Sequence, residues 1–322
     1  MTPAELSRTV LHAVCRAVED GALAVPVPEH IGVERPRPGG CGDYATNVAL
    51  RLARAAGLPP RAVAETLRER IALDPAIASV EITGPGFLNI TLGEGSQRDL
   101  VRRVLEQGRE YGHLRRRAEP AEPEAAVTDD ETRARLWRQT TDRLRRTQGL
   151  APAGRPPALP VPAPAHDPGL GSDAVRWGLL AAAAHDRPRL GAPLLRQHES
   201  NPLFTVRYAH SRARALTRAA GRLGFTSEPG ESSGAPAARL AGLIADYPGV
   251  LASAARLHAP DRLVRHLETT ADALLAFQHT VLPSGDEKPM AAHRSRLALA
   301  EAAGTVLAGG LSLLGVSAPE HL

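Results

Sequence analysis

Residues 113–170 restrict the fold of this 322-residue chain more than any other segment. Pro and Ala dominate its two ends, "RRRAEPAEPEAA" and "APAGRPPALPVPAPAHDPG", and such compositions favour extended chain over packed elements. Between them, "TDDETRARLWRQTTDRLRRTQG" has few apolar residues and predicts one helix, either solvated or weakly packed. We therefore expect a Pro/Ala/Arg-rich linker with one helix, joining two domains at residues 1–112 and 171–322.

The first domain combines helices with a small β-structure. Helices are predicted from apolar periodicity and end signals over residues 4–20, 42–57, 59–72 and 96–112. In the second of these, Asp43 is a candidate N-cap and Gly57 a candidate stop. The stretch "SVEITGPGFLNITLG" changes to strand periodicity around a Gly-Pro-Gly turn and predicts a β-hairpin. Residues 1–112 therefore predict an α+β domain.

The second domain predicts an all-α helical bundle. Its strongest helical pattern is "NPLFTVRYAHSRARALTRAAGRLGF", in which apolar residues recur at spacings of three and four: Val206, Ala209, Ala213, Leu216, Ala220 and Leu223. Arg207, Arg214, Arg218 and Arg222 lie on a different flank of the same helix. Further helices are predicted over residues 171–184, 238–257, 260–282 and 291–316, which is typical of an antiparallel bundle.

Composition excludes some classes of protein and leaves others open. The formal net charge is +4 and nearly all basic residues are Arg, which suits a nucleic-acid partner, but a genome rich in G and C gives the same bias. Two Cys and twelve scattered His predict no disulfide framework and no metal site. We expect no signal peptide at the N-terminus, no apolar run of membrane-spanning length and a cytoplasmic protein.

Several sequence pieces resemble arginyl-tRNA synthetases. "GDYATNVALRLA" and "GPGFLNITL" are similar to the N-terminal additional domain of that family. "GSDAVRWGLLAAAA", "NPLFTVRYAHSRARAL" and the terminal "GGLSLLGVSAPEHL" are similar to its DALR anticodon-binding bundle. The resemblance covers residues 1–112 and 171–322. It implies that tRNA, in particular tRNA(Arg), is the partner of both halves.

The nucleotide-binding catalytic domain that separates these pieces in the family has no counterpart here. The 58 residues between the halves have no room for the βα units of a doubly wound sheet. In "EYGHLR", Glu110 replaces the first histidine of the family's ATP signature, and a helix is predicted before it where the family has a strand. Lys288 is the only lysine, so no lysine loop of the KMSKS type exists. The sequence predicts no catalysis by this chain and no cofactor.

Candidate RNA contacts in the first domain lie in the hairpin and near the second helix. Phe87 and Asn89 are two apart on a strand and share a face, where a stacking aromatic and a base-reading amide suit an unpaired base. The alternative is that Phe87 is core and Asn89 closes a turn. Asp43, Tyr44 and Asn47 can cap and pack the helix start, with Asn47 the better candidate for RNA. The resemblance implies that Phe87 and Asn89 meet the D-loop of tRNA.

Candidate contacts in the second domain lie on the helix with the arginine flank. Arginine binds phosphate with a forked guanidinium and stacks on bases, and Tyr or His can join it. The candidates are Arg207, Tyr208, His210, Arg212, Arg214 and Arg218. The alternative is a solvated polar face with Tyr208 in the core. The resemblance places the "GVSAPE" segment beside the anticodon pocket and so adds Ser317 and Glu320.

Four hypotheses for function follow. The first is a tRNA-binding protein that grips tRNA(Arg) at the D-loop and the anticodon without charging it. The second is an accessory or partner subunit, either of a tRNA-dependent biosynthetic transferase or of a complete synthetase. The third is arginine–tRNA ligase activity as in the family, and the fourth is a remnant with no RNA role. Preference for tRNA over unrelated RNA tests the first, gene neighbours that encode a peptide-forming transferase would indicate the second, and arginine-dependent ATP–pyrophosphate exchange tests the third.

Overall fold

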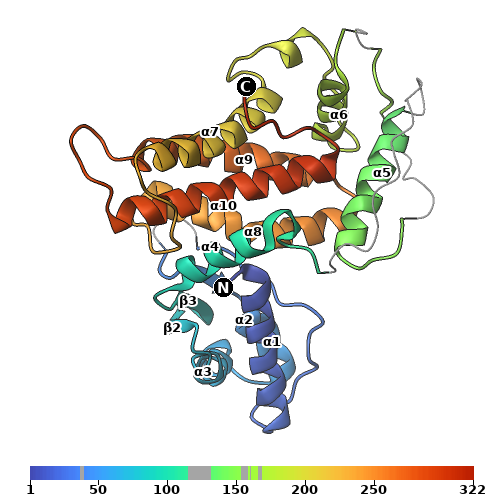
Figure 1. Ribbon diagram of the computed structural model, residues 1–322. Helices are drawn as coiled ribbons and strands as arrows, with labels where there is room; N and C mark the ends of the chain where they lie inside the picture. Colours follow the sequence, from blue (N-terminus) through green and yellow to red (C-terminus); the bar gives the residue numbers. More distant parts are fainter. Residues whose placement is uncertain (37–39, 115–131, 154–158, 160, 166–168) are drawn as a thin grey trace. The chain divides into compact units, whose positions relative to one another are not determined.

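The computed structural model describes residues 1–36, 40–114, 132–153, 159, 161–165 and 169–322 (Figure 1). Contacts divide the chain into two compact units, Met1–Leu100 and Val101–Leu322. The first has a three-stranded sheet with helices, and the regular elements among the described residues of the second are all helices. The predicted α+β and all-α folds are both confirmed. We call the two parts the α+β unit and the helical unit.

The α+β unit is a small sheet with three helices of its own. Its elements are α1 (Pro3–Glu19), β1 (Tyr44–Thr46), α2 (Val48–Ala56), α3 (Pro60–Ile71), β2 (Ile77–Thr83) and β3 (Phe87–Leu92). Both strand pairs are antiparallel, in the order β1-β3-β2. Leu88 and Ile90 of β3 are fully buried with Leu6, Val10 and Val14 of α1 in one core. α4 (Ser96–Gln107) follows and runs across the boundary between the units.

One predicted element in this unit is wrong at its start. Residues Tyr44–Thr46 form β1 rather than the first turn of a helix, and α2 begins only at Val48. Asp43 does not cap α2, because its carboxylate accepts the backbone N–H of Leu92 at 2.8 Å and so closes the end of the β1–β3 ladder. Gly57 ends α2 in the left-handed conformation (φ 64°), as the sequence indicates.

The helical unit is built around its last helix. Its elements after α4 are η1 (Gly108–Glu110), α5 (Thr132–Thr147), α6 (Ser172–Ala181), η2 (Ala192–Leu195), α7 (Pro202–Arg222), α8 (Ala235–Leu257), α9 (Asp261–Phe277), η3 (Gln278–Thr280) and α10 (Ala291–Leu314). α10 packs against α7, α8 and α9, and its side chains are buried along nearly its whole length. This bundle sets the position of α7, which carries most of the candidate RNA contacts.

α10 is long and apolar enough, by length and composition, to cross a membrane, contrary to our expectation that no such run exists. In the helical unit, 83% of its most apolar window is buried against the other helices. That burial is what the central helix of a bundle requires, so α10 is explained by packing.

α7 buries the predicted apolar stripe with one exception. Val206, Ala209, Ala213, Leu216 and Ala220 are all 3% exposed or less. Leu223, by contrast, is 51% exposed, because α7 ends at Arg222 and the following residue leaves the helical face. Asn201 caps the other end, where its side chain accepts the N–H of Phe204.

The helix predicted inside the linker is an integral part of the helical unit. Trp137 is 1% exposed and donates from Nε1 to the carbonyl of His258 at 2.7 Å. Arg133, equally buried, lies 5.5 Å from the Trp137 ring and donates to the carbonyls of Ala182 and Ala183. α5 therefore packs firmly against α6 and α8. The sequence also has two basic clusters, at residues 114–117 and 143–146. The second lies on this helix, whereas residues 115–117 of the first lie outside the described residues.

Gly304 lets α10 approach α7 closely, because a Cβ atom there would lie 2.8 Å from Cβ of Ala213. We expect Gly304→Ala to lower the free energy of unfolding of the helical unit by about 1–3 kcal/mol. The matched control is Gly221→Ala on α7, where a Cβ would meet nothing within 4 Å and helix propensity favours alanine by about 0.5–1 kcal/mol. Urea unfolding followed by tryptophan fluorescence compares them, and a stabilised Gly304→Ala would contradict the close packing.

Candidate nucleic-acid interface

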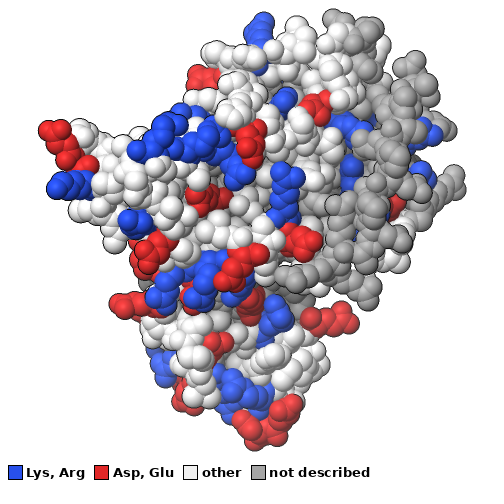
Figure 2. All heavy atoms as spheres, viewed as in Figure 1, with Lys and Arg blue, Asp and Glu red and all other residues white. Residues whose placement is uncertain are grey.

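Three arginines form a row along the outer face of α7. Steps of 100° per residue place Arg207, Arg214 and Arg218 within about 40° of one another around the helix. Figure 2 shows Lys and Arg side chains gathered over α7 with acidic side chains beside them. Arg214 and Arg218 are exposed and Arg207 is half-buried. We call these three residues the α7 arginine row.

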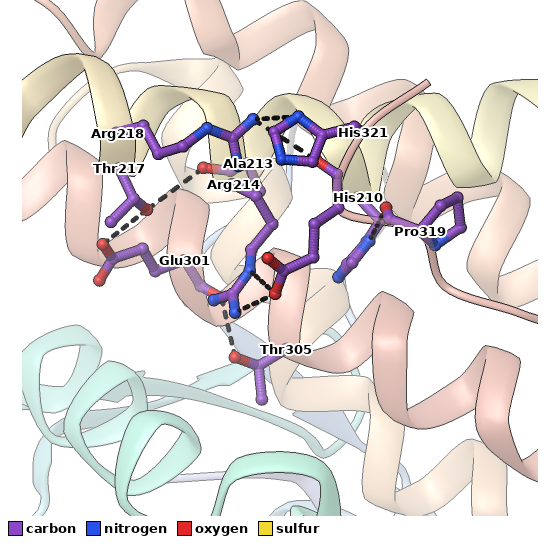
Figure 3. A network of polar contacts seen from close by, with 10 residues as sticks. His210, Ala213, Arg214, Thr217, Arg218, Glu301, Thr305, Pro319 and His321 are labelled. Atoms are coloured by element: carbon purple, nitrogen blue, oxygen red, sulfur yellow. Dashed lines mark hydrogen bonds and ion pairs between the residues drawn. The ribbon is translucent and has the colours of Figure 1, made fainter.

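The segment after α10 lies along this row (Figure 3). Glu320 accepts two hydrogen bonds from Arg214 on one carboxylate oxygen, at 2.7 Å from Nη2 and 3.2 Å from Nε. Arg218 Nη2 lies 3.4 Å from the Glu320 carbonyl and 3.4 Å from Nδ1 of His321. The structure therefore brings two predicted sites, on α7 and in residues 317–320, into direct contact.

His210 is the buried member of this group. It is 3% exposed, and its Nδ1 lies 2.9 Å from the Pro319 carbonyl, which can only accept, so Nδ1 carries the proton. Burial lowers the pKa of His210, and the charge of Arg214 acts in the same direction. His210 is therefore neutral near pH 7 and holds the segment in place rather than offering a charge. The hydrogen bonds from Arg214 lower the pKa of Glu320.

Asp173 at the start of α6 completes the group and was not singled out from the sequence. Its carboxylate accepts from the hydroxyl and from the backbone N–H of Ser317. The same carboxylate oxygen lies 3.9 Å from Nη1 of Arg207. The only sequence signal was its place in "GSDAVRW", where an acidic residue in a first helical turn is ordinary.

Tyr208 and Arg212 point away from the row. Tyr208 is 36% exposed and stacks on Phe204 with ring centroids 5.6 Å apart, so the alternative that it is core is wrong. Arg212 donates from Nε to the Gln278 amide oxygen at 2.8 Å. Arg212 also helps to line an open cavity of about 420 Å³ between α7 and the end of α9. The six candidates on α7 therefore divide between two faces of the helix.

In the α+β unit the candidates gather on the face of the sheet away from the core. Phe87 is 41% exposed, so it is not a core residue. Asn89 is 7% exposed and donates to the Thr83 hydroxyl at 2.7 Å. Asn47 is exposed and directly follows β1, whose Ala45 pairs with Asn89, and it makes no side-chain capping bond to α2. Phe87 and Asn89 therefore lie on β3, and Asn47 lies at the end of the neighbouring strand β1.

The "EYGH" segment has a structural role in the helical unit. η1 follows α4 directly, so Glu110 and Tyr111 come at the end of a helix. Tyr111 is 2% exposed, stacks with Tyr247 at 6.1 Å and donates to the Ile244 carbonyl. Gly112 adopts φ 84° where a Cβ would crowd Leu251. These contacts account for the residues without a nucleotide. Within the described residues, no three His, Cys, Asp or Glu side chains gather as a metal site.

Comparison with known proteins agrees with this arrangement. Residues 5–92 match the family described as arginyl tRNA synthetase N terminal domain. Residues 206–322, which contain the α7 arginine row and the segment on it, match the DALR anticodon binding domain. The chain carries two domains of the arginyl-tRNA synthetase family. The resemblance seen in the sequence is confirmed.

Curated relatives in this family are much longer than the chain. It is 51% identical over 113 residues to an arginine–tRNA ligase of Frankia alni, covering 35% of this chain and 20% of the relative. It is 40% identical over 159 residues to that of Paenarthrobacter aurescens, covering 48% of this chain and 29% of the relative. The solved Thermus thermophilus arginyl-tRNA synthetase shares the fold, at 14% identity and a TM-score of 0.61 over the whole of both chains.

Proposed function

We propose that this chain binds tRNA, with tRNA(Arg) as the preferred partner, without aminoacylating it. The observation that carries the proposal is the α7 arginine row inside a DALR anticodon-binding domain. Guanidinium groups spaced along one helix face suit successive phosphates of an RNA backbone. Tyr208 and Arg212 add a stacking surface and a second cation on the adjoining face, which suits an unpaired base of a loop.

The α+β unit is proposed to bind the D-loop. Phe87 supplies an exposed aromatic face, and Asn89 beside it supplies an amide. Asn47 directly follows β1, the strand that pairs with β3. An aromatic next to amide groups on a sheet is a common arrangement for holding an unstacked base.

The proposal assigns no catalysis to this chain. The two matched domains stand at residues 5–92 and 206–322, and the interval between them contains the packed helices α4, α5 and α6. A role as an accessory or partner subunit, for a tRNA-dependent transferase or for a full synthetase, is the second candidate. Its support is the small share of each relative that the chain covers. Either role places the protein in the cytoplasm with its RNA.

The test is binding of tRNA(Arg) transcripts to the full chain, beside other tRNAs and an unrelated RNA of equal length. We expect submicromolar binding that prefers tRNA and weakens as salt rises, with a log–log slope of about −0.7 to −0.9 per phosphate contacted. We expect no arginine-dependent ATP–pyrophosphate exchange. Equal affinity for all RNAs would contradict the proposal, and exchange activity would restore the ligase hypothesis.

A further inference from the structure

We propose that residues 317–321 act as an internal competitor of RNA, occupying the α7 arginine row in the free protein and leaving it when tRNA binds. The inference rests on the proposed function, because it concerns the same surface. It adds that the arginines are paired in the free state and that Glu320 stands where an RNA phosphate would stand. We call residues 317–321 the C-terminal latch.

The first support is that every member of the row is already engaged. One carboxylate oxygen of Glu320 accepts two hydrogen bonds from Arg214. Arg218 contacts the backbone carbonyl of Glu320 and the ring of His321. Arg207 faces Asp173, which also binds Ser317. An RNA phosphate that takes the place of these contacts at Arg214 and Arg218 must therefore displace the latch, and at Arg207 it competes with Asp173.

The second support is the geometry of the carboxylate. An anionic oxygen that accepts two N–H bonds from one guanidinium reproduces the contact that a phosphate oxygen makes with arginine. Arg214 and Glu320 are 51% and 55% exposed, so a phosphate can reach the same guanidinium from solvent. The Arg214–Glu320 pair thus has the same geometry as the Arg214–phosphate contact that we expect in the complex with tRNA.

The third support is that the latch is held weakly beyond a fixed anchor. Val316 is 4% exposed and fixes the point where the chain leaves α10 at Gly315. Beyond it, Ser317, Glu320 and His321 are exposed and are held by polar contacts, and the half-buried Pro319 accepts a hydrogen bond from His210. Exposed ion pairs contribute little to stability and are screened by salt, so a polyanion can displace them. Release of the latch beyond Val316 therefore breaks these polar contacts, including the His210–Pro319 bond, and leaves Val316 in the bundle.

Two variants of the full chain test the inference by tRNA(Arg) affinity. Glu320→Gln removes the competing charge and should tighten binding by about three- to fivefold. Ser317→Ala loosens the latch without changing net charge and should tighten it by about twofold. The matched controls are Glu228→Gln, an exposed acid after α7, and Ser312→Ala, an exposed serine of α10, and both should leave the affinity within error of wild type.

A double-mutant cycle assigns the effect to the contact. In an Arg214→Ala background, the gain from Glu320→Gln should fall to less than half, because the partner of the carboxylate is gone. Hydrogen exchange gives a second readout. The backbone amides of Ser317, Ala318, Glu320 and His321 should exchange faster when tRNA is added, whereas those of α10 should not.

The outcomes separate the two proposals. Wild-type protein that binds no tRNA overturns the proposed function, and the latch with it. Binding that is unchanged in both variants, or slower exchange of residues 317–321 in the complex, overturns the latch and leaves the proposed function intact. Weaker binding by Glu320→Gln also overturns it, and would make Glu320 a residue that positions Arg214 for RNA.

Discussion

Trp137→Ala should lower the free energy of unfolding of the helical unit by about 3–5 kcal/mol. The side chain is 1% exposed, and its removal leaves a cavity beside α8 and an unmet carbonyl at His258. It also takes away the ring beside the buried guanidinium of Arg133. This is the largest stability effect that we expect from one substitution in α5, because Trp137 joins α5 to the turn between α8 and α9.

Urea unfolding measures the effect, with Trp177 as the reporter. The chain has two tryptophans, and both lie in the helical unit, so Trp177 still reports its unfolding in the variant. Arg138→Ala, one residue along α5 and only half-buried, is the matched control and should change stability by less than about 0.5 kcal/mol. If Trp137→Ala were as mild as its control, α5 would be a loosely attached linker helix after all.

The double substitution Arg214→Ala/Arg218→Ala should weaken tRNA(Arg) binding by about tenfold at low salt. Each arginine that neutralises a phosphate contributes about 0.7–0.9 to the slope of log affinity against log salt, so the slope should fall by about 1.4–1.8. The loss should be similar for cognate and non-cognate tRNA, because phosphate contacts do not read bases. Nitrocellulose filter binding at four or five salt concentrations gives both quantities.

A control of equal charge makes this result specific to α7. Arg256 and Arg262 are exposed in the same unit, at the end of α8 and the start of α9. Arg256→Ala/Arg262→Ala lowers the net charge by the same amount away from the row. An equal loss in both doubles would mean that the overall charge of the unit, and not the α7 face, attracts RNA.

Periodicity predicted the elements that are long and amphipathic. The stripe from Val206 to Ala220 and the Gly-Pro-Gly hairpin are where the sequence places them. β1 was not predicted, because three residues are too few to show an alternation of apolar and polar side chains. Its formation depends on pairing with β3, more than forty residues away in the sequence. The firm packing of α5 was not predicted because Arg133, Thr140 and Thr141 are polar yet buried. Apolar periodicity therefore does not reveal the buried face of this helix.

The candidate site was predictable in its residues and not in its pairings. A helix wheel places Arg207, Arg214 and Arg218 together, since their relation is local. That Glu320 meets Arg214 across 106 positions follows from the path of the chain after α10, which no local rule supplies. The same wheel places Arg212 about 120–160° away from these three arginines, but its hydrogen bond to Gln278 at the end of α9 again joins residues far apart in the sequence.

Because the latch begins where α10 ends, the direction in which it leaves the helix depends on the number of residues in α10. One amino acid inserted between Gly304 and Leu314 would turn all that follows by about 100° and advance it by about 1.5 Å, swinging Glu320 off α7. An insertion in the exposed stretch 284–289, before α10, does not change the rotation of Glu320 relative to α10. Insertions and deletions in descendants of this chain should therefore be found before α10 and be rare within it.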